Sequence, residues 1–557
     1  MITYRQLIVV GLLFGASSLA GAQTAKEPYQ TYEGGPEFLL DGPGSVAPSF
    51  NYSRSVTSGS SFVGSMPMGA SAAVTIGFKG VDQFDLRTIL GGSFIPPDTM
   101  GAVGTTQFME TTNGVYGIYN KTTGAVEAKL DARVFWANAG RTDGSGLNGD
   151  ARVMFDVTSQ KWIAIQFGKS VADIQIAVST TSNAMGSWNS TKFTGYSGGV
   201  ADYPTLAMDK DAVYIGTNNF GAGGAFSGTT LNVISRTDLF GVTPVTTSLK
   251  QFATPYSSTS GSNVDRGFAI QGVNSTGPDS GMVIAASLFA NDSLRYNVTN
   301  PGTAVASLTP VQALSLADYS GNHGGRQPDG TRNIDTLDER IGASAWEKNG
   351  KIYSVYTATQ IGSTHTEVRW VVLNAATNAV IQEGRIADPN YDFYEGSLSV
   401  NSLGQVVIAY NRSGYAALDG SVSLMARTFN SDSSGALYQT NDLLIHVSDV
   451  SNYHNGSAEG APAVGRQRWG DYSAVSLDPS DDENFWIVGE YAAEWNNAAG
   501  GHPGGGGGSS WGTWISAVTL AADLGQGTVP EPATNVLILA GLAGLGLLLQ
   551  RRSPAGK

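Results

Sequence analysis

An acidic residue followed by a short alternating or apolar run recurs seven times in this chain, and no other feature restricts the fold as strongly. The intervals between successive acids are 52, 52, 63, 74, 56 and 76 residues. Two further segments rich in Val, Ile and aromatic residues follow each run, as at residues 161–167 and 174–179. Short segments of this kind, bounded by Gly, Asn or Asp, are typical of β-strands. The repeated acids are Asp98, Asp150, Asp202, Asp265, Glu339, Glu395 and Asp471.

Strand units repeated at this interval predict a β-propeller, because each unit can bury its apolar faces only against its neighbours. No helical periodicity of comparable length appears between the two ends of the chain, so we expect an all-β fold. Seven blades of four strands over residues 75–520 account for the repeats, and a two-sheet sandwich array is the alternative. The expected fourth strands lie at residues 126–135, 191–194, 247–252, 311–316, 380–386 and 443–447.

The last repeat has no fourth strand after Leu520. Residues 78–90 precede the first acid and could supply that strand. We therefore expect the N-terminal side of the chain to complete the last blade and close the ring.

Composition excludes several classes of site and partner. The 557 residues include no Cys, so disulfides and thiolate metal sites are excluded. With 46 acidic and 32 basic residues, the net charge is −14. Such a surface repels phosphates and anionic lipid headgroups. We expect no nucleic acid partner, and membrane contact only through the C-terminal helix described below, before processing.

The N-terminus has the pattern of a secretory signal peptide over residues 1–22. Arg5 supplies the positive charge, residues 7–14 form an apolar run, and Ala20 and Ala22 form a small-residue cleavage site. A membrane anchor is the alternative, but the apolar run is short for a bilayer span. Residues 23–74 are rich in Gly, Ser and Pro and predict an irregular leader.

The C-terminus combines three features in a fixed order. Pro530, Glu531 and Pro532 precede an apolar stretch at residues 533–549, and Arg551 and Arg552 follow it. Seventeen residues of helix span about 25 Å, just enough for a bilayer, with the Arg pair on the cytoplasmic side. Residues 521–529 would form a linker, and residues 530–557 a sorting segment with a transmembrane helix. A plain C-terminal anchor is the alternative.

This order of Pro-Glu-Pro, apolar helix and terminal Arg cluster resembles the PEP-CTERM sorting signal. The resemblance implies that the export machinery and an exosortase are partners, and that the exosortase removes the tail. It also implies export through an inner-membrane intermediate to the cell surface or the extracellular space. Proteins of this class are linked with production of extracellular polysaccharide and biofilm.

The last repeat contains Arg468-Trp469-Gly470-Asp471-Tyr472-Ser473. This block resembles a motif of exported bacterial propeller proteins described as sialidase-like. Residues 176–188 and 202–220 are similar to their second and third blades. The resemblance implies the fold but assigns no reaction. The stretch at 179–188 departs from the Asp-box of true sialidases, because Asn183 stands near the position of the Asp.

The repeated acids would approach one another where the innermost strands begin. One hypothesis is that each carboxylate accepts backbone N–H bonds from a neighbouring loop and joins blade to blade. The alternative is that Asp98, Asp150, Asp202 and Asp471 hold a cation such as calcium. No EF-hand loop is present, and the sequence requires no cofactor.

Long connections at the same mouth carry the candidate binding residues Arg468, Trp469, Trp495 and Trp511. Aromatic rings pack on the apolar faces of sugars, so we expect binding of an extracellular polysaccharide. A secreted carbohydrate-active enzyme, such as a sialidase-like glycosidase, is the first alternative; its acids would be Asp471, Glu490 or Glu494. A structural matrix component is the second. The sequence itself assigns no catalytic residue.

Overall fold

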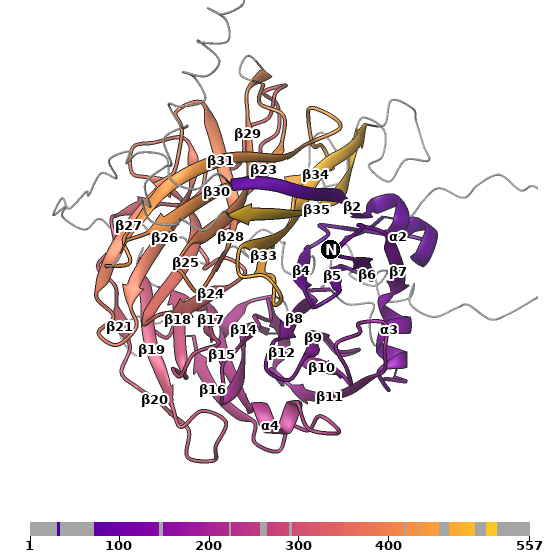
Figure 1. Ribbon diagram of the computed structural model, residues 1–557, viewed down its shortest axis with the longest axis vertical. Helices are drawn as coiled ribbons and strands as arrows, with labels where there is room; N and C mark the ends of the chain where they lie inside the picture. The colour runs from indigo at the N-terminus through magenta and orange to yellow at the C-terminus, as the bar shows by residue number, and fades with distance from the viewer. Residues whose placement is uncertain are drawn as a thin grey trace, which may run out of the picture.

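The computed structural model describes residues 31–33, 72–143, 149–221, 224–256, 265–288, 292–416, 419–432, 434–455, 467–495 and 508–520. The predicted signal peptide, the linker, the sorting segment and its helix lie outside these ranges. Within them, no helix has the length and apolar character needed to cross a bilayer. The described chain is mostly β, and its sheets are arranged around a common centre as in a propeller (Figure 1).

The first two sheets are four-stranded antiparallel meanders that run outward from the centre. One contains β4 (Met100–Val103), β5 (Gln107–Thr112), β6 (Val115–Asn120) and β7 (Val126–Asp131). The next contains β8 (Arg152–Asp156), β9 (Lys161–Phe167), β10 (Asp173–Ser179) and β11 (Trp188–Thr194). The middle strands are buried along most of their length because both of their faces are covered by neighbouring sheets.

In the third sheet, two short inner strands share one partner. Both β12 (Gly199–Asp202) and β13 (Ala207–Met208) pair with β14 (Ala212–Gly221), followed by β15 (Phe226–Ser235) and β16 (Lys250–Pro255).

The following two meanders are joined by a parallel pair. The first contains β17 (Phe268–Ser275), β18 (Met282–Ala286) and β19 (Ser293–Thr299), with β20 (Ser307–Leu308) and β21 (Gln312–Ala313) outside them. The second contains β24 (Ala345–Lys348), β25 (Lys351–Gln360), β26 (Thr366–Asn374) and β27 (Val380–Ile386), and β22 (Tyr319–Ser320) adds to β25. Parallel pairing of β17 with β24 shows that these inner strands run in the same direction.

The last two sheets complete the arrangement. One contains β28 (Tyr391–Val400), β29 (Val406–Gly414), β30 (Ser423–Ser431) and β31 (Leu437–Val447). The other contains β33 (Ala474–Leu477), β34 (Asn484–Trp495), β35 (Ser509–Leu520) and β2 (Ala72–Asp82). Two small pairs lie apart from the meanders, β1 (Thr31–Glu33) with β3 (Ser93–Ile95) and β23 (Ile334–Asp335) with β32 (Gln467–Arg468).

Pairing of β2 with β35 joins the N-terminal side of the chain to its C-terminal strand, as the indigo and yellow strands in Figure 1 show. The expectation that a segment before the first acid supplies the missing strand is confirmed, but its bounds are not. The strand ends at Asp82, and α2 (Gln83–Leu90) follows. The Asp82 carboxylate accepts from the backbone N–H of Asp85, and the Asp85 carboxylate accepts from that of Asp82. This capping box starts the helix.

A second helix occupies part of a segment that was expected to be a strand. Residues 126–135 were expected to form one strand, but β7 ends at Asp131 and α3 (Ala132–Asn138) follows it. Asp131 is the N-cap and accepts from the backbone N–H of Arg133 at 2.7 Å. A further short helix, α4 (Arg236–Leu239), follows β15.

The core lies between neighbouring sheets. Ile163, Ile176 and Val213 belong to one buried cluster between the second and third sheets. Val368 and Leu398 belong to another, between the β24–β27 and β28–β31 sheets. Because each sheet is covered on both faces, its inner strand is held in place from both sides. This packing positions the side chains at the two ends of the inner strands.

Candidate functional site

The repeated acids gather where the inner strands begin, and five of them are buried. Asp98 precedes β4, Asp150 precedes β8, Asp202 ends β12, Glu395 lies in β28 and Asp471 precedes β33. Asp98, Asp150 and Glu395 have positive φ values of 49°, 62° and 53°. This uncommon backbone conformation recurs at equivalent places in different sheets. We call these five residues, together with Glu490 of β34, the acid cluster.

Two of these carboxylates join neighbouring sheets. Asp98 Oδ1 accepts from the backbone N–H of Asp471 at 3.1 Å, and its Oδ2 accepts from Asn113 Nδ2 at 2.6 Å. Asp150 Oδ2 accepts from the backbone N–H of Tyr203 at 3.2 Å. The hypothesis that the acids join blade to blade is confirmed at these two positions.

The other repeated acids act differently. Asp265 is partly exposed and accepts from Ser287 Oγ at 2.6 Å and from the backbone N–H of Leu288 at 3.2 Å, which holds the turn after β18. Glu339 is also only partly buried. These two acids therefore lie outside the acid cluster.

Burial raises the pKa values of several carboxyls in the acid cluster. Loss of solvation and the nearby carboxylates raise the pKa values of Asp98, Asp150 and Glu395 well above their ordinary range. Burial, followed by the charge of Asp471, raises the pKa of Asp202 to about 7. Asp471 differs from them because it receives two ion pairs, from Arg468 at 2.9 Å and Arg340 at 3.2 Å.

The predicted cation site gains no support from this geometry. In the described ranges, no three His, Cys, Asp or Glu side chains are grouped so that they could hold a metal ion. Asp98 and Asp150 instead accept hydrogen bonds, and Asp471 forms ion pairs.

The end of the centre that holds the acid cluster has no room for a sugar. Its hollow, lined by Tyr203, Arg340, Glu395 and Asp471 among others, has a volume of about 30 Å³. That volume holds a water molecule and not a sugar ring. Of the acids considered for catalysis, Asp471 and Glu490 are buried, whereas Glu494 is exposed near the end of β34.

The prediction of an aromatic binding surface is wrong for two of its three Trp residues. Trp469 and Trp511 are fully buried. Their indole N–H groups donate to Asn411 Oδ1 at 3.2 Å and to the Phe94 carbonyl at 2.8 Å. Arg468 is buried in its ion pair with Asp471. Both rings belong to one buried cluster formed by segments distant in the sequence, so they cannot stack on a polymer. The side chain of Trp495 lies outside the described residues.

A layer of stacked side chains closes the centre beneath the acid cluster. The rings of Tyr203 and Tyr472 lie 4.9 Å apart. The Arg152 guanidinium lies 3.6 Å from the centre of the Tyr472 ring, and that of Arg340 lies 4.3 Å from the centre of the Tyr203 ring. Tyr203, Tyr472 and Arg340 line the small hollow, whereas Arg152 lines a larger cavity. The layer therefore lies between the two spaces, and Ala343 lines both of them.

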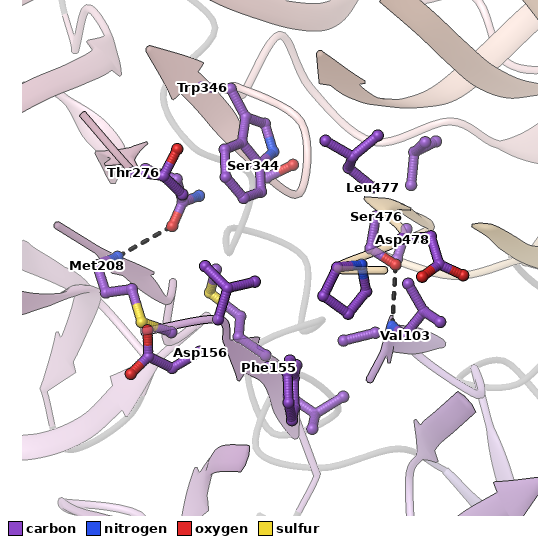
Figure 2. A pocket seen from close by; sticks show the side chains of 18 of the residues that line it. Val103, Phe155, Asp156, Met208, Thr276, Ser344, Trp346, Ser476, Leu477 and Asp478 are labelled. Atoms are coloured by element: carbon purple, nitrogen blue, oxygen red, sulfur yellow. Dashed lines mark hydrogen bonds between the residues drawn. The ribbon is translucent and has the colours of Figure 1, made fainter. Parts of the chain in front are cut away.

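The larger space, which we call the central cavity, has a volume of about 500 Å³ and lies where the inner strands end (Figure 2). Its wall is mostly apolar, with polar side chains between. This size and character fit a small-molecule site. The side chains labelled around the central cavity in Figure 2 are Val103, Phe155, Asp156, Met208, Thr276, Ser344, Trp346, Ser476, Leu477 and Asp478.

Hydrogen bonds between strands hold this wall. Ser476 Oγ accepts from the backbone N–H of Val103 at 3.1 Å, and Asn274 Oδ1 accepts from that of Met208 at 2.9 Å; Figure 2 shows both. Most polar groups of the wall are already engaged. The indole N–H of Trp346 is an exception, because it has no hydrogen-bond partner in the described chain.

Ion pairs engage the two labelled carboxylates of the wall. Arg236 pairs with Asp156, and Lys121 pairs with Asp478 at 2.8 Å. Neither carboxylate is therefore an uncompensated charge in the cavity.

The residues of the central cavity were missed in the sequence, although the repeat contains the signal. Val103, Asp156, Met208, Val400 and Leu477 follow their acids by five or six residues. An inner strand of that length places its last residue at the opposite end of the sheet from the acid. The repeat could therefore have located both ends of the centre.

The geometry defines a propeller-like protein with a central cavity. Residues 528–552 match the PEP-CTERM protein-sorting motif, which confirms the resemblance of the C-terminus. The chain is thus an exported protein sorted by exosortase, through a membrane-anchored intermediate to the cell surface.

Comparisons of the whole chain give only distant similarity. No curated protein matches. The RRP9 WD40 repeats share 8% identity with a TM-score of 0.38, covering 82% of this chain and 99% of that one. A protein of unknown function from Dyadobacter fermentans shares 9% identity with a TM-score of 0.36, covering 81% and 99%. A neuraminidase-like protein from a little yellow-shouldered bat isolate shares 8% identity with a TM-score of 0.33, covering 64% and 98%.

Proposed function

We propose that this protein is a seven-bladed propeller that binds an extracellular polysaccharide at the cell surface, with the central cavity as its binding site. Each of the seven antiparallel meanders would be one blade, and β2 would complete the last. Residues 23–71 would be a leader after the signal peptide, shorter than the expected 23–74 because β2 begins at Ala72. Residues 521–529 would be a linker to the sorting tail.

The central cavity carries this proposal. Its size and lining suit a sugar unit, since the rings of Phe155 and Trp346 lie among hydroxyl groups such as those of Ser344 and Thr276. Aromatic faces pack against the apolar face of a sugar, and polar groups bind its hydroxyls. The exported destination supplies the ligand class, because polysaccharides surround the cell there.

Titration of the exported protein with a panel of bacterial polysaccharides and their short oligosaccharides tests the proposal. Trp346→Ala should weaken binding about tenfold, or about 1.4 kcal/mol, and Trp346→Phe should retain most of it. Tyr415→Ala is the matched control, because Tyr415 is an exposed aromatic residue outside the cavity. Equal binding by wild type and a folded Trp346→Ala variant would overturn the assignment of the site.

The same titrations address the alternatives. Release of shorter glycans by the wild-type protein would favour an enzyme. No binding to any glycan, with or without calcium, would favour a structural role. We propose no catalysis at the acid end, because Asp471 and Glu490 are buried beside a hollow of about 30 Å³.

A further inference from the structure

Arg152 differs from several arginines of low exposure because it forms no ion pair, and Arg295 is the other buried arginine without one among the described residues. Arg340 and Arg468 bind the Asp471 carboxylate, and Arg326 binds that of Asp392 at 2.7 Å. Arg152 is only 1% exposed, yet it forms no ion pair with a carboxylate of the described residues. A buried guanidinium without an anion is unusual, because burial removes the water that would solvate its charge.

The contacts of Arg152 leave part of its guanidinium unused. Nε donates to the Pro204 carbonyl at 3.1 Å, and Nη1 lies 3.4 Å from the Met100 sulfur, which is a weak acceptor. The guanidinium stacks on Tyr472. Nη2 has no hydrogen-bond partner in the described chain. A strong charged donor therefore remains available.

The position of Arg152 links this donor to the central cavity. Arg152 lines that cavity together with Met100, Ala343 and Ala474, which lie near the starts of their inner strands. It therefore belongs to the deep end of the cavity, next to the tyrosine layer. The two carboxylates labelled in Figure 2 already form ion pairs, Asp156 with Arg236 and Asp478 with Lys121.

The neighbouring acids do not supply the missing anion. Asp150 lies two residues before Arg152, and the charge of Arg152 lowers its pKa, but burial and the charges of Asp202 and Asp471 raise that pKa well above its ordinary value. Its Oδ2 accepts from a backbone N–H group and not from Arg152. Asp471, which is ion-paired, has Arg340 and Arg468 as partners.

We infer that Arg152 forms an anion-binding subsite at the deep end of the central cavity, and that the sugar unit bound there carries a carboxylate. This inference rests on the proposed function and specifies its ligand as an acidic polysaccharide. A planar guanidinium binds a carboxylate by charge-assisted hydrogen bonds, and low solvent exposure strengthens them. The sugar ring would then lie against the apolar wall.

The net charge of −14 sets the conditions of the test. An acidic surface repels an acidic polymer at a distance, so low salt would weaken the encounter. At about 0.15 M salt the Debye length is about 8 Å, which screens the surface but not a buried contact. The titrations should therefore be made at that ionic strength.

Calorimetric titration of the exported protein with a short oligogalacturonate, and with the same oligosaccharide after reduction of its carboxyl groups, tests the inference. Wild type should bind the acidic form about tenfold or more tightly. Arg152→Gln should remove this preference, and Arg152→Lys should keep part of it. Arg133→Gln is the control, because Arg133 pairs with Asp131 away from the cavity and its loss changes the net charge equally.

Two results would overturn the inference: equal binding of both ligands by wild type, or a preserved preference in folded Arg152→Gln. If that variant does not fold, the two ligands on wild type and on Arg152→Lys decide the question. Thermal unfolding with galacturonate alone separates the two proposals. If no polysaccharide binds while galacturonate stabilises wild type and not the Arg152 variants, the polysaccharide function is wrong and the anion subsite stands.

Discussion

Asp98 Oδ1 accepts a hydrogen bond from the backbone N–H of Asp471 at 3.1 Å, although 373 residues separate them in the chain. This contact joins the first sheet to the last at the inner end, and the pairing of β2 with β35 extends the last sheet at its outer edge. The last sheet is therefore connected to the N-terminal part of the chain both near the centre and at its outer edge. These two connections restrict sliding of the first sheet against the last.

Replacement of Asp98 should separate its hydrogen-bonding role from its charge. Asp98→Ala leaves the Asp471 N–H and Asn113 Nδ2 without an acceptor, which should cost about 2–4 kcal/mol of unfolding free energy. Asp98→Asn keeps an acceptor oxygen, and should cost less than about 1.5 kcal/mol because burial already raises the pKa of Asp98 well above its ordinary value. Urea unfolding measures both. Equal losses would show that the charge matters more than the bond.

Deletion of residues 72–82 should expose the edge of β35 and produce aggregation. The exposed surface includes Trp486, because Phe78 of β2 packs against it with ring centres 6.4 Å apart. Deletion of residues 34–70 is the control and should leave the protein monomeric by size-exclusion chromatography. Similar behaviour of both variants would contradict closure of the ring by β2.

The Asp202 carboxyl should make folding stability depend on pH. Its folded pKa of about 7 lies above the unfolded value of about 3.9, so its contribution is fully present below about pH 4. As the pH rises toward 7, the unfolded state loses its proton first and this stability is lost. Asp202→Asn carries no titrating proton, so its stability relative to wild type should rise between pH 5 and pH 8. Urea unfolding at the two pH values measures this change. A constant difference between the two proteins would contradict the raised pKa.

Gly470 lies against the Glu490 carboxyl, so a methyl group there should be costly. A Cβ at position 470 would lie 2.3 Å from Glu490 Oε1. Gly470→Ala should therefore lower the unfolding free energy by about 1–3 kcal/mol. The double variant with Glu490→Ala should lose less than the sum of the single changes, because the clash is removed. Strict additivity would show that the two groups do not touch.

Sorting should remove the C-terminal tail. Because residues 528–552 match a motif that exosortase recognises, the exported protein should lack Arg551 and Arg552. Intact-mass measurement of protein from an exosortase-containing host tests this. Replacement of Pro530, Glu531 and Pro532 by Ala should leave the tail attached. Retention of both arginines in exported wild type would contradict processing.

The repeat made much of the fold predictable. Residues 161–167 and 380–386 form strands with the expected bounds, because local alternation of apolar residues determines a strand wherever it is buried. The helix at Gln83–Leu90 was not anticipated. Its capping residues Asp82 and Asp85 are visible in the sequence, but a strand pattern overlaps them.

The sequence by itself determined the export route, the all-β class and the positions of the acids, because these depend on local order along the chain. The tertiary structure decided what each side chain faces. Trp469 and Trp511 look like binding residues in a loop, but distant segments bury them. Arg152 looks like one more basic residue in a strand, yet its burial beside the central cavity leaves it without a carboxylate partner in the described chain. Burial is a property of segments that meet only in the folded ring, so local sequence does not contain it.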